Sequence, residues 1–168
     1  MNILNKALFL DRDGVINENE KPINKPEDFK LYKGVKEALS KAQKNEFEIF
    51  VVTNQGGIEI GHITVEQLNR IHEKMIEMLK PYCNIREIKF CPDYHLDSGC
   101  RKPSPKMILE LAERYNINLK ESYMIGDRDT DIEAGKRAGC KTGKIGRFNS
   151  DADVNGKSLY DIVNNIIN

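Results

Sequence analysis

The chain has 168 residues, of which 39 % are hydrophobic and 31 % are charged, and its 26 basic and 26 acidic side chains cancel. This length and balance predict one domain with a core of its own, and they exclude a disordered tail, a collagen-like repeat and a disulfide scaffold. Because the net charge is zero and no basic run occurs, we expect no binding to nucleic acid or to an anionic membrane through bulk charge.

Neither a membrane span nor a secretory signal is evident in the sequence. No apolar run reaches the roughly 18–20 residues that a span needs, and residues 1–6 lack the apolar region and cleavage site of a signal peptide. We therefore expect a cytoplasmic monomer. Cysteines stay reduced in that compartment, so we expect core thiols or metal ligands, not disulfides, at Cys83, Cys91, Cys100 and Cys140.

Strands and helices are predicted to alternate along the first half of the chain. Short apolar runs at 7–10 and 49–52 predict buried strands, and apolar residues at helical spacing predict a helix that Gly34 opens. The Thr-x-x-Gln sequence at 64–67 has the form of a capping box and predicts a long helix that ends near Pro81. The face of this helix that we expect to be buried consists of Val65, Leu68, Ile71, Met75 and Met78.

The same alternation continues to the end of the chain. Ser104 and Pro105 are typical of a helix N-terminus, and Gly139 is typical of a helix end. The remaining predicted elements are strands at 85–91, 122–126 and 141–145 and helices at 104–115, 129–138 and 157–166. Strands that alternate with helices predict an α/β fold, in which a central parallel sheet carries helices on both faces.

Polar residues end four of the predicted strands: Asp11, Thr53, Cys91 and Asp127. In parallel sheets a ligand binds beyond the carboxyl ends of the strands, so these side chains indicate a site there. Asp11 and Asp13 are two residues apart in extended chain and face the same side, where their carboxylates repel unless a cation or a proton lies between them. A hard divalent ion such as Mg²⁺ fits that demand, and Asp127 can add a third carboxylate. Taken alone, Asp-Arg-Asp-Gly could equally be a loop turn.

Four motifs in order resemble the haloacid dehalogenase (HAD) superfamily of phosphotransferases. They are D-x-D-G from Asp11, T-N at Thr53, the lysine Lys102, and G-D-x-x-x-D at 126–131. The resemblance covers residues from about 6 to 146. It implies a single HAD-like phosphatase domain over 1–168, a Rossmann-like three-layer sandwich without a large cap domain, because no gap between the motifs holds a second core.

The resemblance also implies roles for individual residues. Asp11 would be the nucleophile that forms an aspartyl-phosphate, and Asp13 would protonate the leaving alcohol and later activate water. Mg²⁺ would be held by Asp11, Asp127 and the backbone carbonyl of Asp13. The phosphate-binding residues would be Thr53, Asn54, Arg101 and Lys102, and Asp131 would orient the lysine or the waters on the metal.

The segments 11–17, 53–58 and 100–103 are similar to one HAD subfamily, which contains heptose 1,7-bisphosphate 7-phosphatases and histidinol-phosphatase domains. That similarity implies a Mg²⁺-dependent phosphomonoesterase for a small phosphorylated sugar. Residues 57–61 favour D-glycero-D-manno-heptose 1,7-bisphosphate as the substrate, whereas 126–132 fit histidinol phosphate at least as well. A DNA 3′-phosphatase is disfavoured by the neutral charge, and a non-catalytic phosphate-binding protein is disfavoured by the intact acids and lysine.

The subfamily pattern places zinc ligands as C-x-H and then C-x-C before R-K-P. Cys91 and Cys100 match the first and last ligand, but Asp93 and Ser98 occupy the other two positions. His95 could take the place of a missing ligand, and Asp93 could add an oxygen ligand. These two residues and the two cysteines would then form a Zn²⁺ site. The alternative is a zinc-free loop that hydrogen bonds or packing hold together.

Other residues have simpler interpretations. We expect His62 and His72 on the surface, and Cys83 and Cys140 as small core residues. The rim of an open site is expected from the loops 18–30, 55–62 and 92–101.

Overall fold

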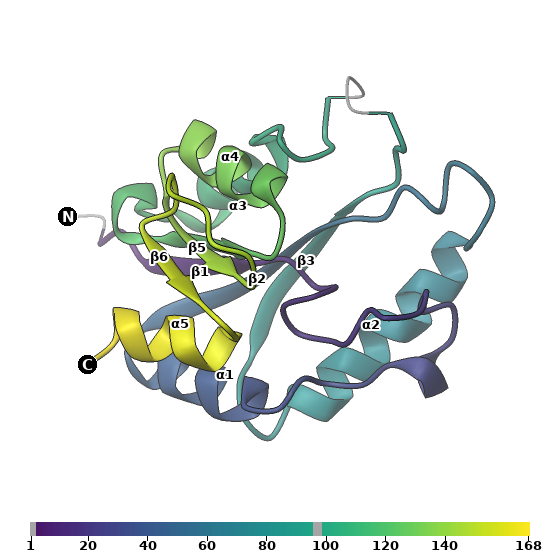
Figure 1. The fold of residues 1–168 in the computed structure, drawn as a ribbon, viewed down its shortest axis with the longest axis horizontal. Helices are drawn as coiled ribbons and strands as arrows, with labels where there is room; N and C mark the ends of the chain where they lie inside the picture. The colour runs from purple at the N-terminus through teal and green to yellow at the C-terminus, as the bar shows by residue number, and fades with distance from the viewer. Residues whose placement is uncertain (1–2, 96–98) are drawn as a thin grey trace.

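The computed structural model describes residues 3–95 and 99–168, which form a central parallel sheet with helices on both faces (Figure 1). The strands lie in the order β3-β2-β1-β4-β5-β6, and all neighbours are parallel. Their bounds are β1 (Lys6–Leu10), β2 (Phe47–Asn54), β3 (Ile85–Cys91), β4 (Tyr123–Gly126), β5 (Lys141–Ile145) and β6 (Val154–Gly156). The predicted α/β architecture is confirmed.

The helices divide between the two faces of the sheet (Figure 1). Helices α1 (Val35–Lys44), α2 (Val65–Leu79) and α5 (Leu159–Ile166) cover one face, and α3 (Lys106–Tyr115) and α4 (Asp129–Ala138) cover the other. Strand β1 supplies both cores, because alternate side chains point to opposite faces. Leu8 and Leu10 belong to the core under α1, and Ala7 and Phe9 belong to the core under α3.

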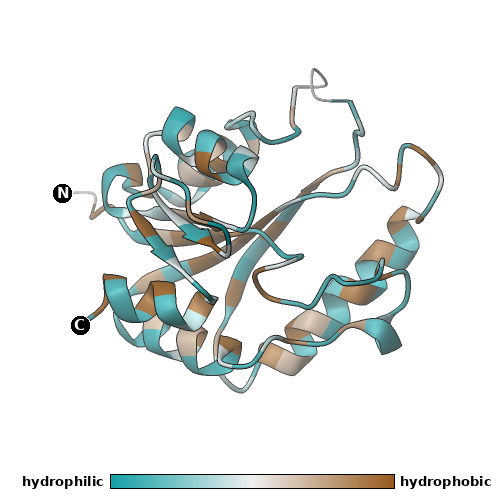
Figure 2. Cartoon of the chain, viewed as in Figure 1, coloured by the Kyte–Doolittle hydropathy of each residue, from teal (hydrophilic) through white to brown (hydrophobic). Residues whose placement is uncertain are grey.

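Hydropathy follows this layering. Figure 2 shows brown, hydrophobic residues in the central strands and mixed colours along the helices, as expected for helices with one buried face. Two short 3₁₀ helices, η1 (Pro26–Asp28) and η2 (Leu119–Glu121), complete the elements. No helix in the described part of the chain is both long enough and apolar enough to cross a membrane.

Most predicted helix boundaries lie within two residues of the observed ones. Thr64 caps α2 as predicted: its hydroxyl accepts from the Gln67 amide at 3.1 Å, and the Gln67 side chain accepts from the Thr64 amide at 2.9 Å. The prediction that Val65 is buried is wrong, since it is 44 % exposed and the helix first meets the core one turn later, at Leu68. Strand β6 was not predicted, because its three residues contain no apolar run.

The strand order brings the expected catalytic segments to one edge. Strand β1 lies between β2 and β4. The chain adds β2 and β3 on one side of β1 and the later strands on the other side, so the strand order reverses at β1. At such a point a crevice opens beyond the carboxyl ends of the strands. The backbone amide of Asp11 donates to the carbonyl of Ile125 at 3.0 Å, which continues the β1–β4 pairing past the end of β1. Residues that follow β1, β2 and β4 therefore converge.

Helix α4 approaches the sheet at a glycine. A Cβ atom added to Gly135 would lie 2.7 Å from Cβ of Met124 and 2.8 Å from Cγ2 of Thr142, which belong to β4 and β5. Real carbon atoms do not approach so closely. Because α4 begins at Asp129, two residues after Asp127, this contact helps to set the distance between the site's acidic segment and the sheet.

We predict that Gly135→Ala lowers the free energy of unfolding by about 1–2 kcal/mol, although alanine is the better helix former by about 1 kcal/mol. The cost of overpacking against the sheet outweighs the gain in helix propensity. Urea unfolding followed by circular dichroism measures the change. Lys136→Ala, at an exposed position of the same helix, is the matched control and should be nearly neutral. A Gly135→Ala variant more stable than the parent protein would contradict the prediction.

Candidate active site

Lys102 lies at the centre of the site, in a group of acids. Its Nζ is 3.1 Å from Oδ1 of Asp11 and 2.6 Å from Oδ1 of Asp131, and it donates to the carbonyl of Val52 at 2.8 Å. The side chain is only 2 % exposed. Burial opposes the charge of the ammonium group, but the two carboxylates outweigh it and raise the pKa of Lys102. The lysine is therefore a fixed positive charge.

The acids around this lysine repel one another. Burial, followed by repulsion from Asp131, raises the pKa of Asp11 to about 7, although Lys102 acts in the opposite direction. The same two causes raise the pKa of Asp127. The charge of Lys102 thus compensates only part of the negative charge of these acids, and a second cation would compensate the rest.

The donor set fits a hard divalent ion. Carboxylate oxygens of Asp11, Asp127 and Asp131 all lie within 4.8 Å of one another. Oδ1 of Asp127 is buried and has no hydrogen-bond partner in the described part of the chain. A buried carboxylate oxygen without a donor is costly unless a cation binds it, and clustered oxygens are the ligands that Mg²⁺ prefers. Asp131 joins this group by its side chain, and the carbonyl of Asp13, which the resemblance implies as a further ligand, stays a prediction.

Two glycines allow the acids to come this close. Gly14 has a φ of +83°, which favours glycine, and a Cβ atom there would lie 2.1 Å from Oδ2 of Asp127. A Cβ atom on Gly126 would lie 2.2 Å from the side chain of Asp131. Any larger residue at either position would displace a carboxylate of the cluster.

The Asp13 carboxylate lies apart from this cluster and accepts several hydrogen bonds. Its Oδ1 accepts from Arg12 and from Nδ2 of Asn17 at 3.0 Å, and its Oδ2 accepts from Nε2 of Gln55 at 3.1 Å. Burial alone would raise its pKa, but the Arg12 guanidinium and these hydrogen bonds lower the pKa of Asp13. The two aspartates of the motif therefore differ: the pKa of Asp11 is raised and that of Asp13 is lowered.

The segment after β2 connects these groups. Nε2 of Gln55 donates to Oγ1 of Thr53 at 2.9 Å as well as to Asp13. The Asn54 side chain makes two hydrogen bonds to the backbone of Lys102: its Oδ1 accepts from the amide at 2.9 Å, and its Nδ2 donates to the carbonyl at 3.2 Å. In this arrangement Asn54 places the lysine, and its own contact with phosphate stays a prediction.

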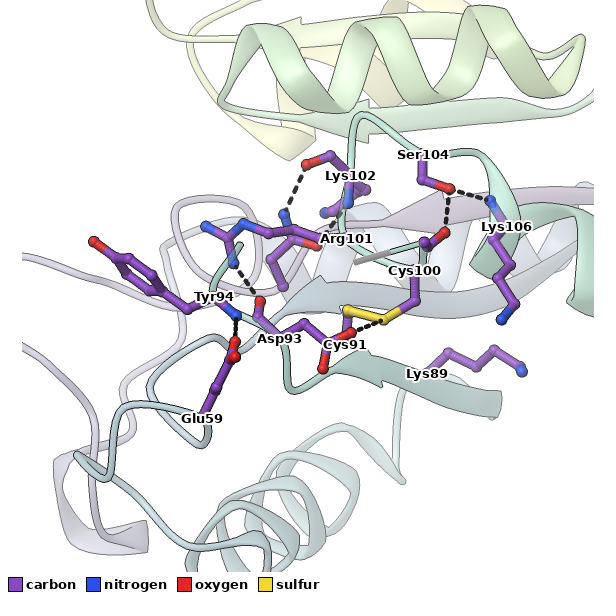
Figure 3. Close-up of a disulfide and its surroundings, with 12 residues drawn as sticks. Glu59, Lys89, Cys91, Asp93, Tyr94, Cys100, Arg101, Lys102, Ser104 and Lys106 are labelled. Carbon is purple, nitrogen blue, oxygen red and sulfur yellow. Dashed lines mark hydrogen bonds between the residues drawn. A yellow bond between two sulfur atoms is a disulfide. The ribbon is translucent and has the colours of Figure 1, made fainter. Parts of the chain in front are cut away.

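A cavity opens above these residues, and Asp11, Asp13, Asn54, Arg101 and Lys102 line it. Nη1 of Arg101 donates to the carbonyl of Asp93 at 3.1 Å, and its guanidinium carbon lies 5.8 Å from the ring centre of Tyr94 (Figure 3). Nε of Arg101 is buried without a hydrogen-bond partner in the described residues. This guanidinium therefore has a free donor for an anionic ligand.

Two of the predicted rim loops line this cavity. Residues of 55–62 and 92–101 belong to its lining. Residues of 18–30 line neighbouring hollows, one of which also includes Asp127. The loop at 18–30 folds back on itself, because the amide of Glu18 donates to the carbonyl of Lys30 at 2.9 Å.

Cys91 and Cys100 form a disulfide, with 5.7 Å between their Cα atoms (Figure 3). The prediction of reduced cysteines is therefore wrong for this pair, because the loop brings the two Cα atoms within disulfide range. Disulfide sulfurs are not thiolate ligands. Asp93 lies beside the pair, with its Oδ2 3.3 Å from Sγ of Cys100. The sulfurs and this carboxylate form a compact group.

The remaining residue of the predicted Zn²⁺ site, His95, is outside the group of Cys91, Asp93 and Cys100, and its Nε2 is 3.9 Å from Oε1 of Glu59. Ser98, which occupies a ligand position of the subfamily pattern, lies outside the described residues. The disulfide thus favours the zinc-free loop, held together by a covalent bond instead of hydrogen bonds or packing alone.

His72 is buried, so its predicted surface position is wrong. It occupies the same face of α2 as Leu68 and Met75, at helical spacing, and this spacing was the signal for burial. Nη1 of Arg12 lies 3.0 Å from its Nε2. Three residues that contact Asp13, directly or through Arg12, were not predicted from the sequence: Arg12, Gln55 and His72.

The chain is similar to named phosphatases in sequence and in structure. A family model described as HAD-hydrolase-like matches residues 99–147. A D-glycero-β-D-manno-heptose-1,7-bisphosphate 7-phosphatase of Helicobacter pylori is 38 % identical over 140 residues, which are 82 % of this chain and 81 % of that protein. A D-glycero-α-D-manno-heptose-1,7-bisphosphate 7-phosphatase of Photorhabdus laumondii is 36 % identical, over 89 % of this chain and 88 % of that protein.

A crystal structure of a D,D-heptose 1,7-bisphosphate phosphatase from B. bronchiseptica, complexed with magnesium and phosphate, superposes with a TM-score of 0.86. It is 27 % identical, and the match covers 96 % of this chain and 98 % of that chain. From these matches, and from the acids and the lysine at the carboxyl ends of the strands, the chain belongs to the HAD-superfamily phosphatases, in the family of the heptose 1,7-bisphosphate 7-phosphatases.

Proposed function

We propose that this chain removes the 7-phosphate of D-glycero-D-manno-heptose 1,7-bisphosphate in a reaction that depends on Mg²⁺. One arrangement carries the proposal: Asp11 and Lys102 are in contact in the lining of a cavity that Arg101 also lines. A phosphate beside this pair would meet the nucleophile and a fixed positive charge. The names of the relatives support the choice of sugar.

Asp11 performs the first chemical step. One of its carboxylate oxygens attacks phosphorus, a new O–P bond forms, and the bond from phosphorus to the sugar oxygen breaks. Lys102 and the hydroxyl of Thr53 stabilise the negative charge on the other phosphate oxygens. The product is an aspartyl-phosphate on Asp11, and water later attacks it to release inorganic phosphate.

Asp13 moves the proton in both steps. It donates a proton to the departing sugar oxygen and then takes one from the attacking water, so it ends in its starting state. In the free protein the pKa of Asp13 is lowered, which favours the carboxylate. The negative charge of a bound phosphate acts in the opposite direction, raises this pKa and so favours uptake of the proton.

Asp11, Asp127 and the backbone carbonyl of Asp13 would hold Mg²⁺, with Asp131 beside them. When bound, the ion neutralises the charge that would otherwise keep an anionic nucleophile away from an anionic phosphate. The unpaired Oδ1 of Asp127 and the raised pKa values of Asp11 and Asp127 support this assignment.

Arg101 is assigned to the second phosphate of the substrate. Its Nε, which has no hydrogen-bond partner in the described residues, and its position in the cavity wall suit an anion away from the reacting group. Histidinol phosphate carries no second phosphate and would leave this donor unpaired. The bisphosphate is therefore the better match to the cavity.

We predict that Asp11→Asn keeps the fold and lowers turnover of the bisphosphate at least about a thousandfold, because an amide does not attack phosphorus. Asp13→Asn should lower it about 10²–10⁴-fold while phosphate still binds. Release of inorganic phosphate measures both rates. Asn45→Asp, remote from the site at the end of α1, is the control and should retain full activity. Near-normal turnover by Asp11→Asn would refute the covalent mechanism.

Removal of divalent metal with a chelator should abolish activity, and Mg²⁺ should restore it. Ca²⁺ should restore less than about a tenth of it, because its larger and looser coordination misplaces the attacking oxygen. Turnover at matched free ion concentrations measures this difference. Full activity in the presence of the chelator would show that the acidic cluster works without a divalent ion.

Arg101→Ala should remove most of the preference for heptose bisphosphate over the monophosphate. We expect kcat/KM for the bisphosphate to fall about 10–100-fold, which corresponds to the loss of a hydrogen bond to a charged group, while the monophosphate changes much less. Added salt should weaken the preference of the parent protein. The control is Arg70→Ala, an exposed arginine on α2. Faster turnover of histidinol phosphate than of either heptose phosphate would reject the sugar assignment and leave the phosphatase chemistry intact.

A further inference from the structure

The side chain of Arg12 turns into the protein, although its neighbours Asp11 and Asp13 both line the cavity. Arg12 is 2 % exposed and is the largest side chain that the core buries completely. A buried guanidinium needs a partner for its charge and its donors. Nη2 and Nε of Arg12 donate to Oδ1 of Asp13 at 2.8 and 3.3 Å, and Nη1 lies 3.0 Å from Nε2 of His72.

This contact fixes the tautomer of His72. A guanidinium only donates hydrogen bonds, so Nε2 of His72 must accept, and the ring is neutral with its proton on Nδ1. Burial and the nearby charge of Arg12 lower the pKa of His72 to about 3, which agrees with a neutral ring. His72 therefore holds one end of the guanidinium while Asp13 holds the other.

The two oxygens of Asp13 are then no longer equivalent. Oδ1 accepts from two nitrogens of Arg12 and from Asn17, which leaves little room for a proton. Oδ2 accepts only from Gln55 in the described part of the chain, and the Asp13 side chain is 31 % exposed, in the cavity wall. Oδ2 is therefore the oxygen that can exchange a proton with a ligand.

We propose that His72 is a positioning residue which, through Arg12, locks Oδ1 of Asp13 and so presents Oδ2 to the leaving group. The inference rests on the proposed function, because it assumes that Asp13 is the proton donor. His72 does not touch the substrate in this account. It replaces the second carboxylate that a buried arginine would otherwise need, and it does so without adding a negative charge beside the phosphate.

The test uses two substrates that differ in their need for a proton. The sugar oxygen of heptose bisphosphate must be protonated as it leaves, whereas nitrophenolate leaves p-nitrophenyl phosphate without protonation. Single turnovers with the intact protein in excess, with Mg²⁺, follow release of the alcohol and so isolate the first step. The variants are His72→Leu, which removes the acceptor, and His72→Gln, whose side-chain oxygen can replace it.

We expect His72→Leu to slow release of the sugar about 10–100-fold and release of nitrophenolate less than about threefold, with little change in the protein concentration that gives half the maximal rate. His72→Gln should recover most of the loss. Leu79→Ala, which opens a cavity near the other end of α2, is the control for lost stability and should affect both substrates equally. Equal losses on both substrates with His72→Leu, or no loss, would overturn the proposal.

Two further measurements separate the possible failures. Asp13→Asn is the reference: if it also slows both substrates equally, the proton-donor role in the proposed function is wrong. If only His72→Leu does so, the inference alone fails. Should His72→Leu not fold, long-range ¹H–¹⁵N spectra of the unmodified protein decide the matter. They should show His72 with its proton on Nδ1 and without titration between pH 5 and 8, and a proton on Nε2 would overturn the proposal.

Discussion

The ion pairs of Lys102 with Asp11 and Asp131 are the interaction on which the site depends. Three charged groups, all nearly inaccessible to water, are stable only because each compensates another. Loss of Lys102 leaves two carboxylates in the interior without a counter-charge, which costs several kcal/mol. The site therefore exists as a unit. The raised pKa values of Asp11 and Asp127 reflect an excess of negative charge in the site, which favours binding of a cation. The bound cation would in turn favour binding of an anionic ligand.

The parallel sheet brings this unit together from distant parts of the chain. Asp11, the proposed nucleophile, follows β1. Thr53 and Asn54 end β2, and Asp127 follows β4, so three adjacent strands place their carboxyl ends side by side. The lysine comes from the loop between β3 and α3 and reaches the crevice at β2. Glycines at 14 and 126 remove the side chains that would keep the acids apart.

Much of the fold was predictable, because apolar runs, a capping box and a helix-ending glycine are local signals. The acids were predictable because each ends an apolar run. Contacts made by side chains across the fold were not: no local signal links Arg12 to His72, 60 positions away, or Asn54 to the backbone of Lys102. The Cys91–Cys100 disulfide was not predicted, because cysteines in a reducing compartment are expected to be thiols or metal ligands. Whether two cysteines form a disulfide depends on the path of the loop between them, which has no local signal.

Two hydrogen bonds between the Asn54 side chain and the backbone of Lys102 hold the main chain of the lysine against the end of β2. This anchor is separate from the loop that precedes the lysine. That loop can then change its sequence or reshape the cavity wall around Arg101 while the charge of Lys102 stays in place. In the proposed function, substrate choice and chemistry thus belong to neighbouring residues, 101 and 102, which are held by different parts of the fold.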